Sequence, residues 1–141
     1  MAHLALAWYA GTDDVMALCL STSLATAVVA ANAFTLAWTH SIERVRWEEA
    51  WRVEGEVLVL DSVRVSGHGA GMEPGEGATL KDGVWTWHPR TQHAVLRLTR
   101  SPHTADYDWC ENGRPCVPLG ILLPSDNAVT ELRVCPTVMP N

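Results

Sequence analysis

Apolar and polar side chains alternate along residues 45–53, and this two-residue period constrains the fold more than any other feature of the chain. Successive side chains of a strand point to opposite faces of a sheet. One face then carries mostly large apolar groups, at Val45, Trp47, Glu49, Trp51 and Val53. The other carries mostly charged groups, at Arg44, Arg46, Glu48, Ala50, Arg52 and Glu54. We therefore predict a strand here with one apolar and one charged face.

Glu49 is the charged residue on the apolar face of this strand. A carboxylate that leaves water needs a compensating partner, so this position is a candidate for function. Residues 34–39 form a second predicted strand, and His40 and Ser41 follow it directly. A hairpin that joins the two strands brings His40 within reach of Glu48 or Glu49.

Further short strand patterns follow one another between Gly and Pro residues, and no long stretch has a helical repeat. The predicted strands cover residues 15–20, 25–30, 34–39, 45–53, 57–65, 84–87, 94–99, 107–110, 116–119 and 129–135. Asp82-Gly83 is a typical hairpin turn, and one helical turn is predicted at 119–123. We predict an all-β fold, either an antiparallel β-sandwich or a partly closed barrel, of about nine or ten short strands.

Length and hydropathy set the predicted domain organisation. A chain of 141 residues has the size of one domain. We place a single β domain at residues 15–136, between an N-terminal extension at 1–14 and a C-terminal tail at 137–141. Residues 15–34 carry no charge, but hydroxyl side chains dilute the run and acidic residues precede it. We interpret it as two strands and predict no membrane segment.

Charge and composition limit the classes of partner. The net charge of -6, without a cluster of Lys or Arg, argues against nucleic acid and against anionic membrane surfaces. A small or neutral solute, or a protein, remains as the partner. Seven Trp against one Phe and two Tyr predict large flat side chains that fill a core between sheets. We predict no cofactor.

The cysteines favour disulfides. Cys110 and Cys116 flank the turn-forming ENGRP and are placed to close a short loop, whereas Cys19 and Cys135 are placed to tie the terminal strands together. An even count in this layout favours two disulfides and an oxidising compartment, although the connectivity stays open. Four buried thiols in a cytosolic protein are the alternative, and the absence of a CxxC pair argues against a zinc ribbon.

The longest irregular segment is glycine-rich and covers residues 67–77, GHGAGMEPGEG. It lacks the Lys-Ser/Thr ending and the following helix of a phosphate-binding loop, so its glycines are expected to allow close approach of a strand or a ligand. Beneath it, His40, Glu48 and Glu49 form either a metal-assisted or acid–base site or a buried polar network. A Ser-His-carboxylate triad is not predicted, because adjacent His and Ser point to opposite faces and no G-x-S-x-G elbow is present.

Four segments carry a family resemblance, namely THSIERVRWEEAWRV, GHGAGMEP, DGVWTW and DWCENGRPCVPL. They resemble a bacterial family named domain of unknown function 1850, and the resemblance extends over residues 16–135. No catalytic role comes with it, and the metal, if any, is unknown. The signature positions are Thr39, His40, Ser41, Glu48, Glu49, Gly69, Ala70, Gly71 and Met72.

The resemblance also implies a cellular context. Genes of this family often lie beside those of TAXI-type TRAP transporters, whose solute-binding proteins work outside the cytoplasmic membrane. We therefore expect a periplasmic or otherwise extracytoplasmic accessory or solute-binding module, not catalytic, with transporter subunits or a small solute as its partners. The alternative is a small metal-assisted or acid–base enzyme that uses His40, Glu48 and Glu49. A third hypothesis is an interaction domain that pairs through an exposed edge strand.

Overall fold

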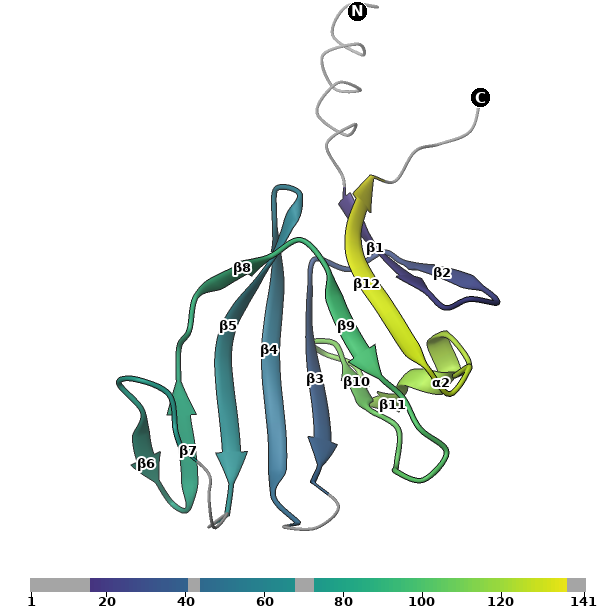
Figure 1. The fold of residues 1–141 in the computed structure, drawn as a ribbon. Helices are drawn as coiled ribbons and strands as arrows, with labels where there is room; N and C mark the ends of the chain where they lie inside the picture. The colour runs from purple at the N-terminus through teal and green to yellow at the C-terminus, as the bar shows by residue number, and fades with distance from the viewer. Residues whose placement is uncertain (1–15, 41–43, 68–72, 137–141) are drawn as a thin grey trace, which may run out of the picture.

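The computed structural model describes residues 16–40, 44–67 and 73–136. These residues form two antiparallel β-sheets that face each other across a shared core, with one short helix (Figure 1). The predicted all-β class is therefore confirmed. Of the two architectures that the sequence indicated, the sandwich is the one that forms.

The first sheet has four strands in the order β2-β1-β12-β9. They are β1 (Met16–Ser21), β2 (Thr26–Val29), β9 (Leu96–Thr99) and β12 (Val129–Pro136). Leucines on alternate positions of three of these strands are buried, at Leu18, Leu20, Leu96, Leu98 and Leu132. Their side chains form this sheet's half of the core.

The second sheet has eight strands in the order β11-β10-β3-β4-β5-β7-β6, with β8 paired to β5. They are β3 (Ala33–Thr39), β4 (Arg46–Glu54), β5 (Val57–Ser66), β6 (Thr79–Lys81), β7 (Val84–Trp87), β8 (Thr91–His93), β10 (Asp108–Cys110) and β11 (Val117–Pro118). Helix α2 (Leu119–Leu122) follows β11 and is the predicted helical turn.

Twelve strands lie within the described residues, where the sequence indicated about nine or ten. The two that it did not indicate are β6 and β8, which have three residues each. So few residues hold no recognisable alternation, and these strands form because β7 and β5 offer them hydrogen-bonding edges. The predicted hairpin turn is present, with φ of 52° at Asp82 and 79° at Gly83.

A β-bulge in the β4–β5 ladder determines which residues of β5 face the first sheet. The register shifts by one residue midway along the ladder, and Asp61 is the extra residue of β5. Leu60 and Val63 therefore both lie on the inner face, although they are three positions apart. Leu60 pairs with Trp51, and Val63 pairs with Glu49.

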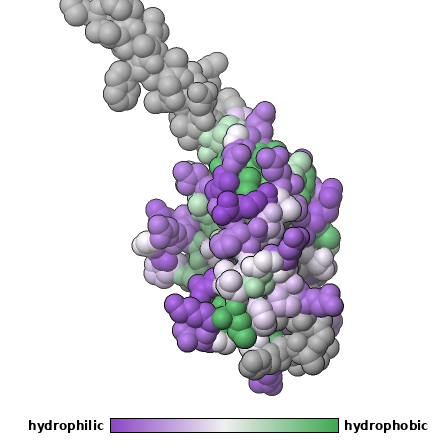
Figure 2. Space-filling model, turned by 90° about the vertical axis from the view of Figure 1, so that its left-hand side faces the viewer, coloured by the Kyte–Doolittle hydropathy of each residue, from purple (hydrophilic) through white to green (hydrophobic). Residues whose placement is uncertain are grey.

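The core has two parts. The main cluster joins both sheets and α2, and its buried residues are Leu18, Leu20, Phe34, Leu36, Trp51, Leu58, Leu96, Leu98, Trp109, Leu119, Leu123 and Leu132. A smaller cluster of Val45, Val63 and Val65 belongs to the second sheet, and Trp47, Trp85 and Trp87 pack against it. In Figure 1, β6 and β7 lie at the end of the second sheet remote from the first. Figure 2 looks at that side and shows a mostly hydrophilic surface with small apolar areas.

Both cysteine pairs suggested by the sequence are formed, and no free cysteine remains. Cys19 of β1 is bonded to Cys135 of β12, with 5.9 Å between their Cα atoms. Cys110 and Cys116 close the loop between β10 and β11, with 4.3 Å between their Cα atoms. Within the described part of the chain, no helix is long and apolar enough to cross a membrane.

Candidate functional site

A cleft of about 330 Å³ opens between the inner face of the second sheet and strand β9 of the first. Its lining combines one carboxylate with aromatic rings and leucines. The lining residues are Trp38, Glu49, Trp51, Leu60, His93, Leu96, Arg97, Leu98 and Tyr107. The cleft therefore lies between residues of the two sheets, beside the main core cluster.

Glu49 reaches this cleft because β4 alternates, as the sequence predicted. It pairs with Leu36 of β3 on one side and Val63 of β5 on the other, so apolar neighbours flank it in the sheet. The indole Nε1 of Trp51 donates a hydrogen bond to Oε1 of Glu49 at 3.2 Å. Among the described residues, no Lys, Arg or His forms an ion pair with this carboxylate.

The environment of Glu49 disfavours its charged form. Burial raises the pKa of Glu49 above its ordinary 4.5, and the hydrogen bond from Trp51 opposes this rise only in part. The carboxyl group is thus partly removed from water without a full set of compensating partners.

Pairs of aromatic rings build the walls of the cleft. Trp38 and Tyr107 meet edge to face, with ring centroids 5.5 Å apart and planes at 75°. Trp51 and His93 meet in the same way at 5.2 Å and 75°. A hydrogen bond of 2.8 Å between His93 Nε2 and Thr91 Oγ1 holds the imidazole on β8. The walls are therefore fixed by ring contacts before any ligand enters.

Tyr107 is electrostatically linked to Glu49. Burial raises the pKa of Tyr107 above its ordinary 10.0, and the negative charges of Glu49 and Asp106 raise it further, against the opposing effect of Arg100. The phenol hydroxyl donates a hydrogen bond to the backbone oxygen of Thr99 at 3.3 Å. Tyr107 therefore stays neutral, with its hydroxyl bonded to the end of β9.

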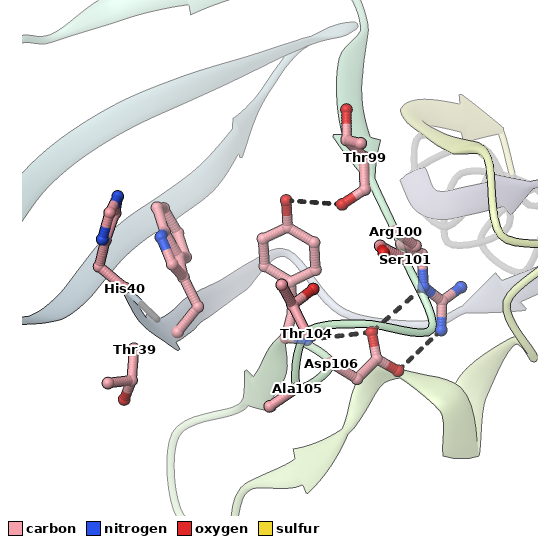
Figure 3. A pocket seen from close by; sticks show the side chains of 10 residues that line it. Thr39, His40, Thr99, Arg100, Ser101, Thr104, Ala105 and Asp106 are labelled. Atoms are coloured by element: carbon pink, nitrogen blue, oxygen red, sulfur yellow. Dashed lines mark hydrogen bonds and ion pairs between the residues drawn. The ribbon is translucent and has the colours of Figure 1, made fainter. Parts of the chain in front are cut away.

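A second cavity, of about 250 Å³, lies next to the cleft and shares Trp38 and Tyr107 with it (Figure 3). Its lining includes the charged residues Arg100 and Asp106, and Arg100 is only 4% exposed. Asp106 accepts bonds from Nε of Arg100 at 3.2 Å and from Nη2 at 2.8 Å. Nη1 donates to the oxygen of Leu123 at 2.8 Å and to Oγ1 of Thr130 at 3.1 Å. These groups satisfy one another's hydrogen bonds, and the cluster thereby links the end of β9 to the end of α2 and to β12.

The structure separates the residues that the sequence grouped as a site. Thr39 and His40 are exposed at the end of β3 and line the second cavity, not the cleft of Glu49. The backbone N–H of His40 donates to the oxygen of Val45 at 2.9 Å, which closes the end of the β3–β4 hairpin. Trp38 and Tyr107 stand between the two cavities.

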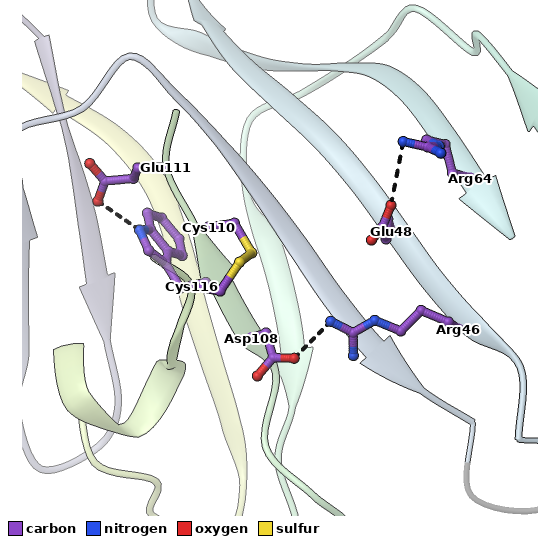
Figure 4. Close-up of a disulfide and its surroundings, with 8 residues drawn as sticks. Arg46, Glu48, Arg64, Asp108, Cys110, Glu111 and Cys116 are labelled. Carbon is purple, nitrogen blue, oxygen red and sulfur yellow. Dashed lines mark hydrogen bonds and ion pairs between the residues drawn. A yellow bond between two sulfur atoms is a disulfide. The ribbon is translucent and has the colours of Figure 1, made fainter. Parts of the chain in front are cut away.

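Glu48 lies on the outer face of the sheet, as strand alternation requires (Figure 4). Its Oε1 is 3.9 Å from Nη1 of Arg64, and the neighbouring Arg46 pairs with Asp108 at 2.8 Å. Glu48 is therefore not brought together with Glu49. The remaining predicted site residues, Ser41, Gly69, Ala70, Gly71 and Met72, lie outside the described residues.

Several lining residues of the cleft had no sequence signal for a site. Tyr107 precedes β10 by one residue and His93 ends the short β8, so both approach Glu49 only through tertiary folding. The strand predicted at 94–99 is present as β9, and its buried Leu96 and Leu98 line the cleft.

Fold and site together define a disulfide-linked β-sandwich domain with one carboxylate in an aromatic cleft. The family model described as "Domain of unknown function (DUF1850)" matches residues 34–119, more than half of the 141-residue chain. The chain belongs to this family. The match contains Glu49 and every other residue of the cleft. It is shorter than the expected 16–135 and leaves β1, β2 and β12 outside. No curated protein and no solved structure matches the chain significantly.

Proposed function

We propose that this chain is an extracytoplasmic accessory or solute-binding module, not catalytic, that works with a TAXI-type TRAP transporter. The observation that carries the binding role is the open cleft with Glu49 on its inner face. Its volume of about 330 Å³ falls at the lower end of ligand pockets, which suits a small solute.

The arrangement of side chains favours binding over the enzymatic alternative. That alternative needs His40, Glu48 and Glu49 around one space, but they lie on two faces of a sheet and line different cavities. Across the described residues, no group of three or more His, Cys, Asp or Glu is placed to hold a metal ion. Glu49 thus faces its cleft without the two partners, His40 and Glu48, on which the enzymatic alternative depends.

The cysteines support the compartment in this proposal. All four are paired, and structural disulfides persist mainly in oxidising environments such as the periplasm. The link to the transporter rests on the gene neighbourhood that goes with the family.

Co-purification tests the proposed partner. The full chain is exported with a C-terminal tag in cells that contain the transporter, and complexes are isolated from the native envelope. We expect the solute-binding or membrane subunits to co-purify, and transporter-dependent uptake to fall when the chain is deleted. Folded, exported protein without associated subunits, together with unchanged uptake, overturns the proposal.

A further inference from the structure

The cleft around Glu49 is lined by one carboxylate and one guanidinium, and the two differ in where their charge is paired. Four lining residues are titratable or charged: Glu49 on β4, His93 on β8, Arg97 on β9 and Tyr107 before β10. Arg97 is the one permanent cation among them. Its Nε donates to Oε2 of Glu131 at 3.2 Å, a carboxylate that Arg133 also binds, and the side chain is 66% exposed, so its charge is directed to the surface and screened by water.

We propose that the cleft binds a small organic cation, an ammonium group on an apolar body, with the charge held beside Glu49. This inference rests on the proposed solute-binding function and names its ligand class. The ammonium supplies the counter-charge that the described residues do not give Glu49. The apolar body lies against the leucine side chains contributed by β5 and β9, namely Leu60, Leu96 and Leu98.

Desolvation is the first argument for a cation. A carboxylate that is partly removed from water and accepts a hydrogen bond from a single indole N–H is disfavoured in its charged form. An ammonium group that forms a charge-assisted hydrogen bond to it offsets this cost, and such bonds are about twice as strong as neutral ones. An anionic ligand has the opposite effect, because it places a second negative charge beside Glu49.

The aromatic lining is the second argument. Trp is the best aromatic partner for a cation, and Tyr also attracts one when the charge lies within about 6 Å of the ring centre. Two Trp residues and Tyr107 line the same space as Glu49. Because edge-to-face contacts already fix these rings, binding costs little additional side-chain ordering.

Calorimetric titration with three probes of similar shape and different charge tests this inference. The probes are 2-phenylethylammonium, 2-phenylethanol and phenylacetate, each titrated at neutral pH into the full disulfide-bonded chain. We expect the ammonium to bind about 10- to 100-fold more tightly than the alcohol, the range of a hydrogen bond to a charged group. Phenylacetate is expected to give no measurable heat of binding.

Two adjacent glutamates provide matched variants. Glu49→Gln keeps an oxygen for the Trp51 N–H and removes the charge, so it should reduce ammonium affinity to that of the alcohol. Glu48→Gln makes the same chemical change on the outer face of the same strand and should leave affinity unchanged. Circular dichroism and thermal melts check that both variants fold.

Each outcome has a defined meaning. Equal affinity for ammonium and alcohol, preference for phenylacetate, or an equal loss in both variants overturns the cationic ligand class. If phenylacetate binds and Glu49→Gln abolishes it, the solute-binding function stands while the ligand class falls. If none of the probes binds, the inference fails, and co-purification with the transporter decides the proposed function separately.

Discussion

Arg100 and Glu49 are charged side chains in neighbouring cavities that share Tyr107, but they differ in how many hydrogen-bond partners the protein gives them. Arg100 donates four hydrogen bonds to protein acceptors and is almost completely buried. Glu49 accepts one hydrogen bond, from Trp51, and faces an open cleft. A buried charge with a full set of partners depends on each of them, because losing one leaves the charge uncompensated, whereas the half-buried Glu49 keeps hydrogen-bonding capacity that the protein does not use. The comparison distinguishes a charge that is fully hydrogen-bonded within the protein from one that is not.

The largest expected effect is a loss of stability when the hydrogen-bonded cluster around Arg100 is broken. Asp106→Ala removes the acceptor for Nε and Nη2 of Arg100, and also the acceptor for the N–H of Gly120. A buried charge left without its partner typically costs about 3–5 kcal/mol in the free energy of unfolding. Urea unfolding at neutral pH measures this loss. A change below about 1 kcal/mol would show that Arg100 does not need Asp106 and would contradict the comparison.

The next effect is on ligand affinity. Binding of 2-phenylethylammonium needs the ionised form of Glu49, so affinity should fall by about tenfold for each pH unit below the pKa that burial raises above 4.5. Tyr107 stays protonated throughout because its pKa is also raised.

His93 and Arg97 also face the cleft, so the pH titration is repeated with His93→Gln to isolate Glu49. Calorimetry over a range of pH gives the affinity at each point. The profile should survive in His93→Gln and disappear in Glu49→Gln. A profile that vanishes only in His93→Gln would assign the pH dependence to the imidazole.

A third effect concerns stability in the absence of ligand. Because burial raises the pKa of Glu49, the folded protein binds more protons than the unfolded chain at pH values between 4.5 and the raised pKa. The stability contributed by this protonated group is fully present below 4.5 and is lost as pH rises through the folded pKa. Glu49→Gln stays neutral, so it should gain stability relative to the wild type as pH rises.

Urea unfolding of the wild type and Glu49→Gln at several pH values measures this difference. Tyr107, His93 and Arg97, the other titratable or charged residues of the cleft, are common to both proteins and cancel to first order. Glu48→Gln serves as the outer-face control and should not reproduce the trend. A stability difference independent of pH would mean that the carboxyl group is compensated in the folded protein.

The smallest effect is expected from Arg97→Gln. The ion pair between Arg97 and Glu131 lies at the surface, where such pairs contribute about 0–1 kcal/mol. The free energy of unfolding should therefore change by less than about 1 kcal/mol, far less than for Asp106→Ala. Affinity for 2-phenylethylammonium should rise slightly or stay the same. A marked loss of affinity would show that the guanidinium takes part in binding.

Alternation along β4 explains why the placement of Glu49 could be predicted from the sequence. The two-residue period over 45–53 correctly places Glu49 on the inner face and Glu48 on the outer face, because the side-chain period of a strand depends only on the strand itself. The hairpin between β3 and β4 follows from the same reasoning. The two cysteine pairs are suggested by where the cysteines fall in the sequence, one pair flanking a short turn and the other near the two ends of the β domain.

The other half of the site depends on how distant segments pack. Tyr107 and His93 have no periodic pattern that points to Glu49, and the bulge at Asp61 leaves no recognisable mark in the sequence. The β3–β4 hairpin does bring His40 close to β4, but the rings of Trp38 and Tyr107 lie between it and the cleft of Glu49, so it lines another cavity. Such separations are set by side-chain volume in three dimensions, which a pattern along one strand does not contain.

The strand order of the first sheet has a consequence for the timing of site formation. Strand β9, the wall of the cleft, pairs with no strand except β12, the last strand of the described residues. A nascent chain that has not yet released β12 therefore leaves β9 without a hydrogen-bonding neighbour and the cleft with one side missing. The cleft is therefore complete only once β12 has paired with β9, although most of its lining lies on other strands.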